Sequence, residues 1–335
     1  MKRLNIVLIG MGRIGQMHLK NISTLPEMFN VVGIADPFSD KLADLADEYN
    51  VTKFSKNYKE LLDKEKVDCV LIASATNTHA EIIREAAGRH LDIICEKPID
   101  TDINRIKDLL KYVDECGVKL QIGFNRRFDH NFAKIRSYVQ NNVLGTPQIV
   151  KISSRDPEPP TMDYVKVSGG LFFDMMIHDL DLIRYLSDSE VEEVTAKGAV
   201  LVDPNIGKLG DIDTAIVTLK FRNGALGVID NSRQAVYGYD QRAEVFGPKG
   251  MAKADNDRNS TVELNLKDNT QLDKMPWFFI DRYKQAYISE LAAFYQSVAN
   301  DKPLVVSGID GLRAVQLAEA CRKSLDSGKT VKVEY

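Results

Sequence analysis

The sequence predicts an α/β protein of two domains, the first built on a doubly wound parallel sheet and the second on a mostly antiparallel sheet. The chain has 335 residues, about twice the length of a typical domain. Short β-branched apolar runs alternate with helical patterns up to about residue 124, whereas residues 191–266 contain only strand patterns. The composition, 44% hydrophobic and 27% charged, is that of a globular protein and excludes disordered and fibrous classes.

Five apolar runs in the first part are typical of strands that are covered on both faces, as in a parallel sheet. Helix-length segments separate them, so right-handed crossover connections are expected. The predicted strands are residues 4–9, 31–35, 68–73, 91–95 and 118–122, and the predicted helices are 13–24, 39–48, 77–89 and 102–116.

After residue 124 the pattern changes, and we expect a division into domains 1–124 and 125–335. A helix is predicted at 130–142, a strand at 147–154 and a strongly apolar, buried helix from Gly170 to Leu186. The turn Asn223-Gly224 separates the predicted strands 214–221 and 224–231. A further strand at 241–246 and two closing helices, 281–299 and 309–327, complete the second domain.

Charge and cysteine content narrow the classes of partner. The 44 basic and 48 acidic residues leave a net charge of −4 without a basic block, which argues against a nucleic-acid partner. No two cysteines have the spacing of a zinc or redox motif, so buried free thiols are predicted. The first apolar run, Leu4 to Ile9, is too short for a signal sequence or a membrane span, and we expect a cytoplasmic protein without a membrane partner. The cysteines are Cys69, Cys95, Cys116 and Cys321.

A G-x-G-x-x-G motif, formed by Gly10, Gly12 and Gly15, follows the first strand and opens the first helix. In this context Gly10 allows a tight turn, Gly12 lets the backbone approach a pyrophosphate, and Gly15 lets helix and strand pack closely. Asp36 ends the second strand 21 positions after Gly15, where a carboxylate can accept hydrogen bonds from the adenosine ribose. The same carboxylate would repel a 2′-phosphate, so NAD is predicted over NADP. Without the motif, Asp36-Pro37 would be an ordinary surface turn.

Glu96-Lys97-Pro98 follows the predicted strand 91–95. Ligands of open α/β sheets bind at the carboxyl ends of the strands, which places Lys97 at the cofactor cleft. The alternative is a surface ion pair between Glu96 and Lys97, although Pro98 fixes the backbone directly after them.

The apolar helix that follows Gly170 carries a polar stripe. At 100° per residue Asp174, His178, Asp181 and Tyr185 share one face, and Asp174 can pair with His178 at i, i+4. A carboxylate-oriented imidazole suits general acid–base catalysis near neutral pH. Two alternatives are a structural Asp–His pair and a metal site that includes Asp181. No cysteine or second histidine lies at ligand spacing, so we expect no metal.

Together with further motifs, these residues resemble the Gfo/Idh/MocA family of NAD(P)-dependent oxidoreductases over essentially the whole chain. The glycine motif and Glu96-Lys97-Pro98 are common to the superfamily, whereas the later blocks are similar to its inositol dehydrogenase branch. These blocks are residues 123–129, 154–157, 168–181, 231–233 and 237–240.

The resemblance implies a Rossmann domain followed by an α+β domain with an open antiparallel sheet, assembled as a homotetramer through the sheet faces. It implies hydride transfer from C2 of myo-inositol to NAD, in which Lys97 holds the reacting oxygen region, His178 takes the hydroxyl proton and Asp174 orients His178. Arg127, Asp156 and Tyr237 match positions that line the polyol pocket in similar enzymes. The alternatives are a surface ion pair for Arg127, a turn for Asp156 and core packing for Tyr237.

Further residues are expected to bind the cofactor, and these motifs do not decide which polyol or sugar is the substrate. The additional cofactor-binding candidates are Arg13, Ile14, Ser74, Asn77, His79, Glu96 and Lys97. Relatives that act on scyllo-inositol, chiro-inositol or aldoses share the same Lys, Asp and His, so another polyol or sugar is an alternative substrate. A non-catalytic NAD-sensing regulator is a second alternative, and Trp277 has no predicted role.

Overall fold

A computed structural model describes residues 3–335, whose internal contacts divide the chain into two compact units. The first unit comprises residues up to Phe128 together with Gln285–Leu312. The second comprises Asp129–Lys284 and Arg313–Tyr335.

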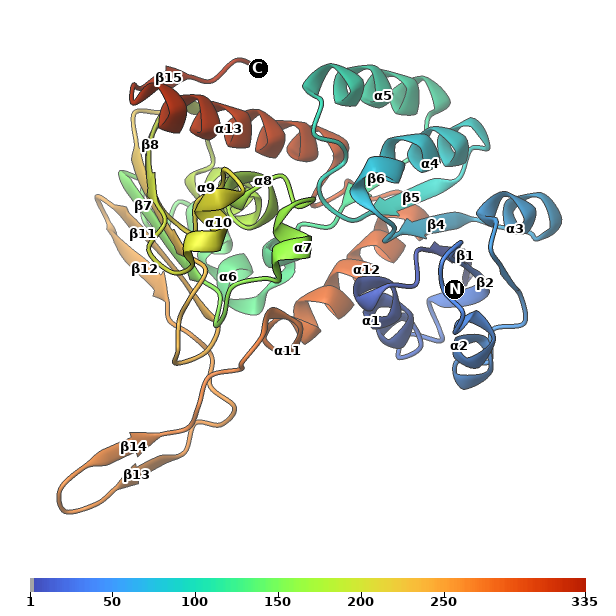
Figure 1. Cartoon of the computed structure of the whole chain (residues 1–335), viewed down its shortest axis with the longest axis horizontal. Helices are drawn as coiled ribbons and strands as arrows, with labels where there is room; N and C mark the ends of the chain where they lie inside the picture. The colour runs from blue at the N-terminus through green and yellow to red at the C-terminus, as the bar shows by residue number, and fades with distance from the viewer. Residues whose placement is uncertain (1–2) are drawn as a thin grey trace. The chain divides into compact units, whose positions relative to one another are not determined.

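The first unit is built on a six-stranded sheet in which every pairing is parallel (Figure 1). Its strand order, β3-β2-β1-β4-β5-β6, is that of a doubly wound dinucleotide-binding fold, which confirms the predicted fold class. The chain reverses its direction of winding between β1 and β4, which are neighbours in this sheet. The strands are β1 (Leu4–Ile9), β2 (Phe29–Ala35), β3 (Phe54–Ser55), β4 (Cys69–Ile72), β5 (Asp92–Cys95) and β6 (Leu120–Ile122).

The helices of this unit include one from near the end of the chain. The side chains of Leu291, Phe294 and Tyr295 on α12 (Lys284–Ala299) lie in the same core as Leu4 and Ile6 of β1. The division into two continuous stretches at residue 124 therefore needs correction, because the apolar face of α12 is buried in the first unit. The other helices are α1 (Arg13–Ile22), α2 (Leu42–Glu48), α3 (Tyr58–Lys64), α4 (Thr76–Gly88) and α5 (Ile103–Cys116). Neither β3 nor α3 was predicted. A strand of two residues, such as β3, has no periodicity to detect.

The second unit contains a seven-stranded sheet in the order β12-β11-β7-β10-β9-β8-β15. Only the pairing of β7 with β10 is parallel, so the prediction of a mostly antiparallel sheet is confirmed. Burial alternates along β9, as expected for a sheet with one covered face. The strands are β7 (Ile149–Arg155), β8 (Val191–Ala199), β9 (Thr214–Phe221), β10 (Leu226–Ser232), β11 (Asp240–Gly247), β12 (Gly250–Ala254) and β15 (Val331–Lys332).

Long helices lie on one face of this sheet, and apolar side chains of the other face are exposed (Figure 1). The helices are α6 (His130–Gln140), α9 (Ile177–Ser187) and α13 (Gly308–Ser327). On the opposite face, Ile216 of β9, Leu226 of β10 and Phe246 of β11 are 53%, 56% and 41% exposed. The sheet is therefore open on one side.

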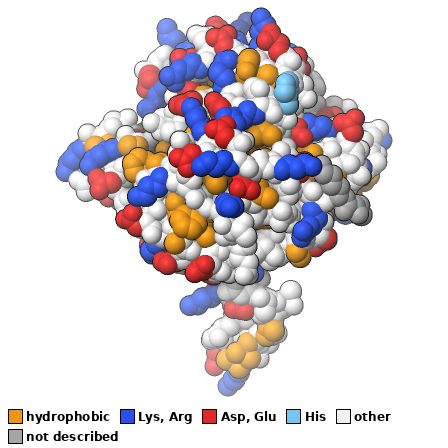
Figure 2. Space-filling view, turned by 90° about the vertical axis from the view of Figure 1, so that its right-hand side faces the viewer, with side chains coloured by type: hydrophobic (Ala, Val, Ile, Leu, Met, Phe, Trp, Pro, Cys, Tyr) orange, Lys and Arg blue, Asp and Glu red, His pale blue; other side chains and the backbone are white. Residues whose placement is uncertain are grey.

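Several short elements were not predicted. A hairpin of β13 (Glu263–Asn265) and β14 (Thr270–Leu272) projects from the second unit, and every residue of both strands is exposed (Figure 1). Figure 2 shows hydrophobic and charged side chains interspersed over the visible face, including the hairpin. The other unpredicted short elements are a 3-10 helix (Asn125–Phe128) and the helices α7 (Met162–Val165), α10 (Pro204–Lys208) and α11 (Phe279–Arg282), the last of which overlaps the start of the predicted helix 281–299. The short helix α8 (Leu171–Asp174) lies within the predicted helix from Gly170 to Leu186.

Two sequence predictions concern the whole chain. All four cysteines are free thiols, and three of them are buried, whereas Cys116 is only partly buried. Among residues 3–335, no helix combines the length and the apolar character that a membrane span requires.

Candidate active site

The glycine motif forms the turn between β1 and α1 in the first unit. Gly10 has φ +95°, and a Cβ there would lie 2.4 Å from the backbone N of Ser74. A Cβ on Gly15 would lie 1.8 Å from the carbonyl oxygen of Gly10, so the helix can approach the strand only without a side chain. A Cβ on Gly12 would have no protein atom within 4 Å. These surroundings match the separate roles that the sequence predicts for the three glycines.

The N-terminus of α1 is available to an anion. Gly12 is the N-cap residue, no side chain caps the helix, and the first turn contains no acidic residue. Arg13 begins the helix and is exposed, and Ile14 is half-buried. Backbone N–H groups and the helix dipole therefore favour a phosphate at this end.

Asp36 lies beside the glycine loop. Its Oδ2 accepts a hydrogen bond of 2.7 Å from the backbone N–H of Met11, and its Oδ1 accepts bonds from the N–H groups of Phe38 and Ser39. Both interpretations of this residue thus apply: its carboxylate orders the turn after β2 and also lies at the glycine motif. The first unit fits NAD through this carboxylate, the space at Gly12 and the free end of α1.

The segment Glu96-Lys97-Pro98 follows β5, with a cis peptide bond between Lys97 and Pro98. Lys97 is half-buried, and Pro98 is buried. His79 of α4 contacts this segment and the loop after β4. Its Nδ1 lies 2.8 Å from the carbonyl oxygen of Pro98, and its Nε2 lies 3.1 Å from that of Ser74. Burial lowers the pKa of His79, although its contacts with the two carbonyl groups act in the opposite direction.

Two predicted cofactor residues belong to the start of α4. The Ser74 hydroxyl shares a 2.7 Å hydrogen bond with Thr78, and Asn77 is exposed in the first turn of the helix. His79 is 99% buried, so in this structure it supports the loops rather than lining a surface. Their contacts with NAD remain predictions.

In the second unit, the predicted helix Gly170–Leu186 is interrupted between the two catalytic candidates. Asp174 ends α8, and His178 lies in the first turn of α9. The backbone N–H of Met176 bonds to the carbonyl oxygen of Leu171, five residues back, so the turn is wider than an α-helical turn. The sequence analysis places Asp174 and His178 on one face of a regular helix, and this prediction is wrong, because the wide turn changes the angle between the two side chains. Such wide turns are frequent at functional sites.

The carboxylate of Asp174 is held by two residues that the sequence analysis did not select. Tyr164 donates a 2.7 Å hydrogen bond to Oδ1, and Nη1 of Arg233 lies 3.2 Å from Oδ2. Arg233 is 99% buried, and Asp211, whose carboxylate accepts from the N–H of Leu171, lies 4.0 Å from its Nη2. Arg233 is thus a buried cation between two carboxylates, a placement that no pattern in the sequence reveals.

The other members of the predicted stripe serve the core. Asp181 is buried with Nη1 of Arg184 3.8 Å from its carboxylate, and the guanidinium of Arg136 lies 5.1 Å from the ring centre of Tyr185. The apolar residues of α9 are buried, as predicted. Asp181 therefore belongs to an ion pair next to the catalytic candidates.

The three predicted substrate residues have different surroundings. Arg127 is buried in the first unit, where it donates to Asp310 at 2.8 Å and to the carbonyl oxygen of Val305 at 3.0 Å. Asp156 is half-buried directly after β7. Tyr237 donates a 2.7 Å hydrogen bond to Asp240. Arg127 thus forms an ion pair, but a buried one rather than the surface pair that the sequence analysis gives as its alternative role. A substrate contact of each residue remains a prediction.

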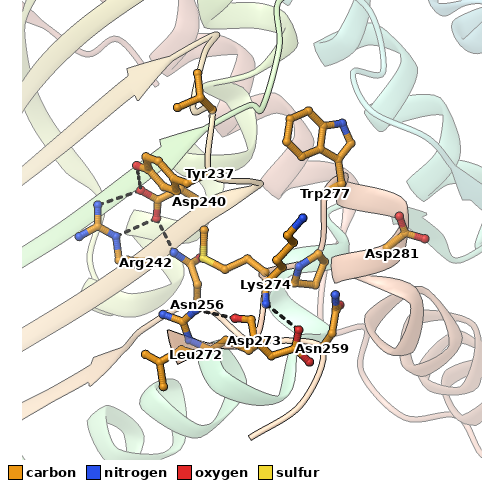
Figure 3. Close-up of a pocket in the computed structure, with 14 residues that line it drawn as sticks. Tyr237, Asp240, Arg242, Asn256, Asn259, Leu272, Asp273, Lys274, Trp277 and Asp281 are labelled. Atoms are coloured by element: carbon orange, nitrogen blue, oxygen red, sulfur yellow. Dashed lines mark hydrogen bonds and ion pairs between the residues drawn. The ribbon is translucent and has the colours of Figure 1, made fainter. Parts of the chain in front are cut away.

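Tyr237 also lines an open pocket of about 1030 Å³ in the second unit (Figure 3). Its carboxylate partner Asp240 accepts hydrogen bonds from Arg242 and Asn256 as well. Burial would raise the pKa of Asp240, but the hydrogen bonds from Arg242, Asn256 and Tyr237 outweigh it and lower that pKa. Trp277, half-exposed, stands on the opposite side of this pocket.

One group of possible metal ligands occurs among the described residues. The ligand atoms of Asp129, His130 and Asp257 lie within 4.8 Å of one another. However, Nη1 of Arg282 lies 2.6 Å from Asp129 and 3.2 Å from Asp257, so both carboxylates already pair with a guanidinium. This group is an ion-pair network that supports α6 and α11.

Two family models match the chain. Residues 4–124 match the oxidoreductase family with an NAD-binding Rossmann fold, and residues 132–253 match the GFO/IDH/MocA C-terminal domain. The chain belongs to the Gfo/Idh/MocA family of oxidoreductases. Its first unit is an NAD-binding Rossmann domain, in agreement with the fit of the glycine loop and Asp36.

Relatives of this family resemble the chain over its full length. It is 45% identical to the myo-inositol 2-dehydrogenase of Thermotoga maritima, with 99% of each chain covered. The crystal structure of a myo-inositol dehydrogenase from Corynebacterium glutamicum shares 40% identity and a TM-score of 0.94, covering all of both chains. The scyllo-inositol dehydrogenase of Lactobacillus casei, solved with NAD(H) and scyllo-inositol, has 26% identity and a TM-score of 0.92, with 99% of each chain covered.

Proposed function

We propose that the protein is an NAD-dependent inositol 2-dehydrogenase that oxidises C2 of myo-inositol to give 2-keto-myo-inositol and NADH. One observation carries the proposal: the carboxylate of Asp174, held by Tyr164 and Arg233, lies just before the wide turn that leads to His178. An NAD-binding protein without catalytic activity would not need a buried arginine and a tyrosine on one carboxylate beside a histidine. The full-length similarity to inositol dehydrogenases supports the same substrate class.

In this reaction the hydroxyl group of the substrate loses a proton and its carbon loses a hydride. Bound NAD supplies the hydride acceptor, at C4 of its nicotinamide. His178 takes the hydroxyl proton, Asp174 orients the imidazole, and Lys97 stabilises the developing negative charge on the oxygen. Lys97 suits this role because His79 and the buried Pro98 fix the backbone on which it stands.

The uncharged substrate requires hydrogen bonds rather than a charge clamp. We assign Asp156, Arg127 and Tyr237 to the hydroxyl groups of the ring, as the family resemblance implies. A site that pairs every hydroxyl rejects an epimer, because the mismatched polar groups would lose their partners on binding.

The decisive experiment measures kcat/KM with NAD on myo-inositol, scyllo-inositol, chiro-inositol and glucose. We expect myo-inositol to give the highest value. A higher value with another compound would identify that compound as the preferred substrate, and the proposed dehydrogenase chemistry would be unchanged. No NADH formation on any of the four, with intact NADH binding, would instead favour an NAD-sensing regulator.

We also propose that the protein is a cytoplasmic homotetramer that associates through the open face of the seven-stranded sheet. The exposed side chains of Ile216, Leu226 and Phe246 form the apolar part of that face, and burying them would stabilise an interface. The double substitution Ile216→Asp with Phe246→Asp should reduce the mass measured by light scattering. An unchanged mass would reject this interface.

A further inference from the structure

The first unit contains a buried carboxyl group that the proposed reaction does not use. Glu290 of α12 is 0% exposed, and neither of its carboxyl oxygens has a hydrogen-bond partner among the described residues. Its position could have been predicted, because Tyr287, Leu291 and Phe294 at i−3, i+1 and i+4 form the apolar stripe of the helix. An acid on such a buried apolar face is unusual, since burying a charge without a partner is strongly unfavourable.

The same region of the core holds Glu96, the residue directly before Lys97. Oε1 of Glu96 lies 2.8 Å from Nε2 of His18, a residue of α1 that is 99% buried. A Cβ on Gly123, just after β6, would lie 2.9 Å from Oε2, so the glycine leaves room for this carboxylate. The ring of Tyr287 packs edge-on against His18, with 5.6 Å between ring centres.

Four elements therefore meet around these groups, namely α1, β5 with the residue that follows it, β6 and α12. The amide of Gln121 on β6 donates a 3.2 Å hydrogen bond to the backbone carbonyl of Glu290 and ties α12 to the sheet. The titratable groups that these contacts place around Glu290 are Glu96, His18 and Tyr287. Burial raises the pKa of Glu290 well above its usual range, and the negative charge of Glu96 raises it further.

We propose that His18, Glu96 and Glu290 form one positioning unit for Lys97. His18 and Gly123 fix the side chain of Glu96, and thereby the backbone from which the next residue, Lys97, projects. A neutral Glu290 fills the space beside Glu96 without adding a second negative charge. The function of Lys97 in this statement rests on the proposed function, whereas the neutrality of Glu290 does not.

The protonation of Glu290 is tested by urea unfolding of the whole protein as a function of pH. In the unfolded chain a glutamate ionises above about pH 4.3, whereas in the folded chain Glu290 keeps its proton. The folding equilibrium constant of Glu290→Gln relative to wild type should therefore rise by about tenfold per pH unit above that value. Glu115→Gln, which removes a 60% exposed carboxylate of α5, is the matched control and should show no such trend. A flat ratio for Glu290→Gln would mean that Glu290 is ionised in the folded protein, and the proposal would be wrong.

The positioning role is tested by kcat together with NADH affinity. Glu290→Ala and His18→Phe should lower kcat by roughly tenfold to a hundredfold, because small displacements of a reacting group are costly. Glu290→Gln, which keeps the size of an uncharged side chain, and His18→Gln, which keeps a polar group for Glu96, should recover most of that loss, while NADH affinity changes little in all four variants. Equal kcat values in Glu290→Ala, His18→Phe and wild type would overturn this role. If wild type itself oxidises no polyol, the proposed function fails, but the unfolding experiment still reports on Glu290.

Discussion

Replacing Gly12 by alanine should weaken cofactor binding and leave the stability of the fold nearly unchanged. Gly12 has φ −69° and ψ −170°, an extended conformation that alanine adopts without strain. A Cβ at this position would have no protein atom within 4 Å. Alanine restricts the unfolded chain, which stabilises the fold by about 0.4–1 kcal/mol. Because Gly12 is the N-cap of α1, where glycine is preferred over alanine, a loss of similar size offsets this gain, and we expect little change in Tm.

The new methyl group would occupy the space in which the pyrophosphate of NAD approaches the N-terminus of α1. A phosphate displaced from this end loses hydrogen bonds to backbone N–H groups, each worth about 1.5–3 kcal/mol when one partner is charged. Loss of one such bond weakens NADH binding by roughly tenfold to a hundredfold.

NADH fluorescence titration and thermal unfolding measure the two effects on the same sample. Gly15→Ala is the contrasting variant, since its Cβ would lie 1.8 Å from the carbonyl oxygen of Gly10 and should destabilise the first unit severely. An NADH affinity of Gly12→Ala within about twofold of wild type would refute the assignment of this space to the pyrophosphate.

Four other predictions concern the cofactor, the catalytic groups, an acid-sensitive site and metal dependence. Asp36→Ser should weaken NADH binding and reduce discrimination against NADPH, and unchanged affinities for both would reject the assignment. His178→Asn and Lys97→Met should each lower kcat by at least about a hundredfold with NADH affinity retained, and near-normal turnover would contradict that role. Burial would raise the pKa of Asp213, but hydrogen bonds from the N–H groups of Leu201, Asp203 and Val202 outweigh it and lower that pKa. Asp213→Asn should therefore destabilise the protein at pH values above the pKa of an unfolded aspartate. In urea unfolding, the difference in unfolding free energy between wild type and variant should vanish as the pH falls through the lowered pKa of Asp213. A free-energy difference that does not depend on pH would argue against an ionised Asp213. Dialysis against a chelator should leave activity intact, and a loss restored by a divalent cation would show a metal requirement.

The parallel sheet and the glycine loop of the first unit could be predicted from the sequence alone, whereas the contribution of α12 to its core could not. The glycine motif, the acidic residue after the second strand and the strand–helix alternation depend on contacts close in sequence, and the strand order and the surroundings of Gly10, Gly12 and Gly15 agree with them. The mostly antiparallel second sheet was also predictable, because alternating side chains and the turn at Asn223-Gly224 are local signals.

The distant residues that surround the candidate groups are known only from the folded structure. Tyr164 and Arg233 reach Asp174 from 10 and 59 positions away, and the wide turn before His178 depends on a backbone bond that no side-chain pattern encodes. Likewise, α12 returns to the first unit and brings Glu290 into the same core as Glu96 and His18. The physical reason is that periodicity shows which face of an element is buried, whereas its partners depend on how separate elements pack together.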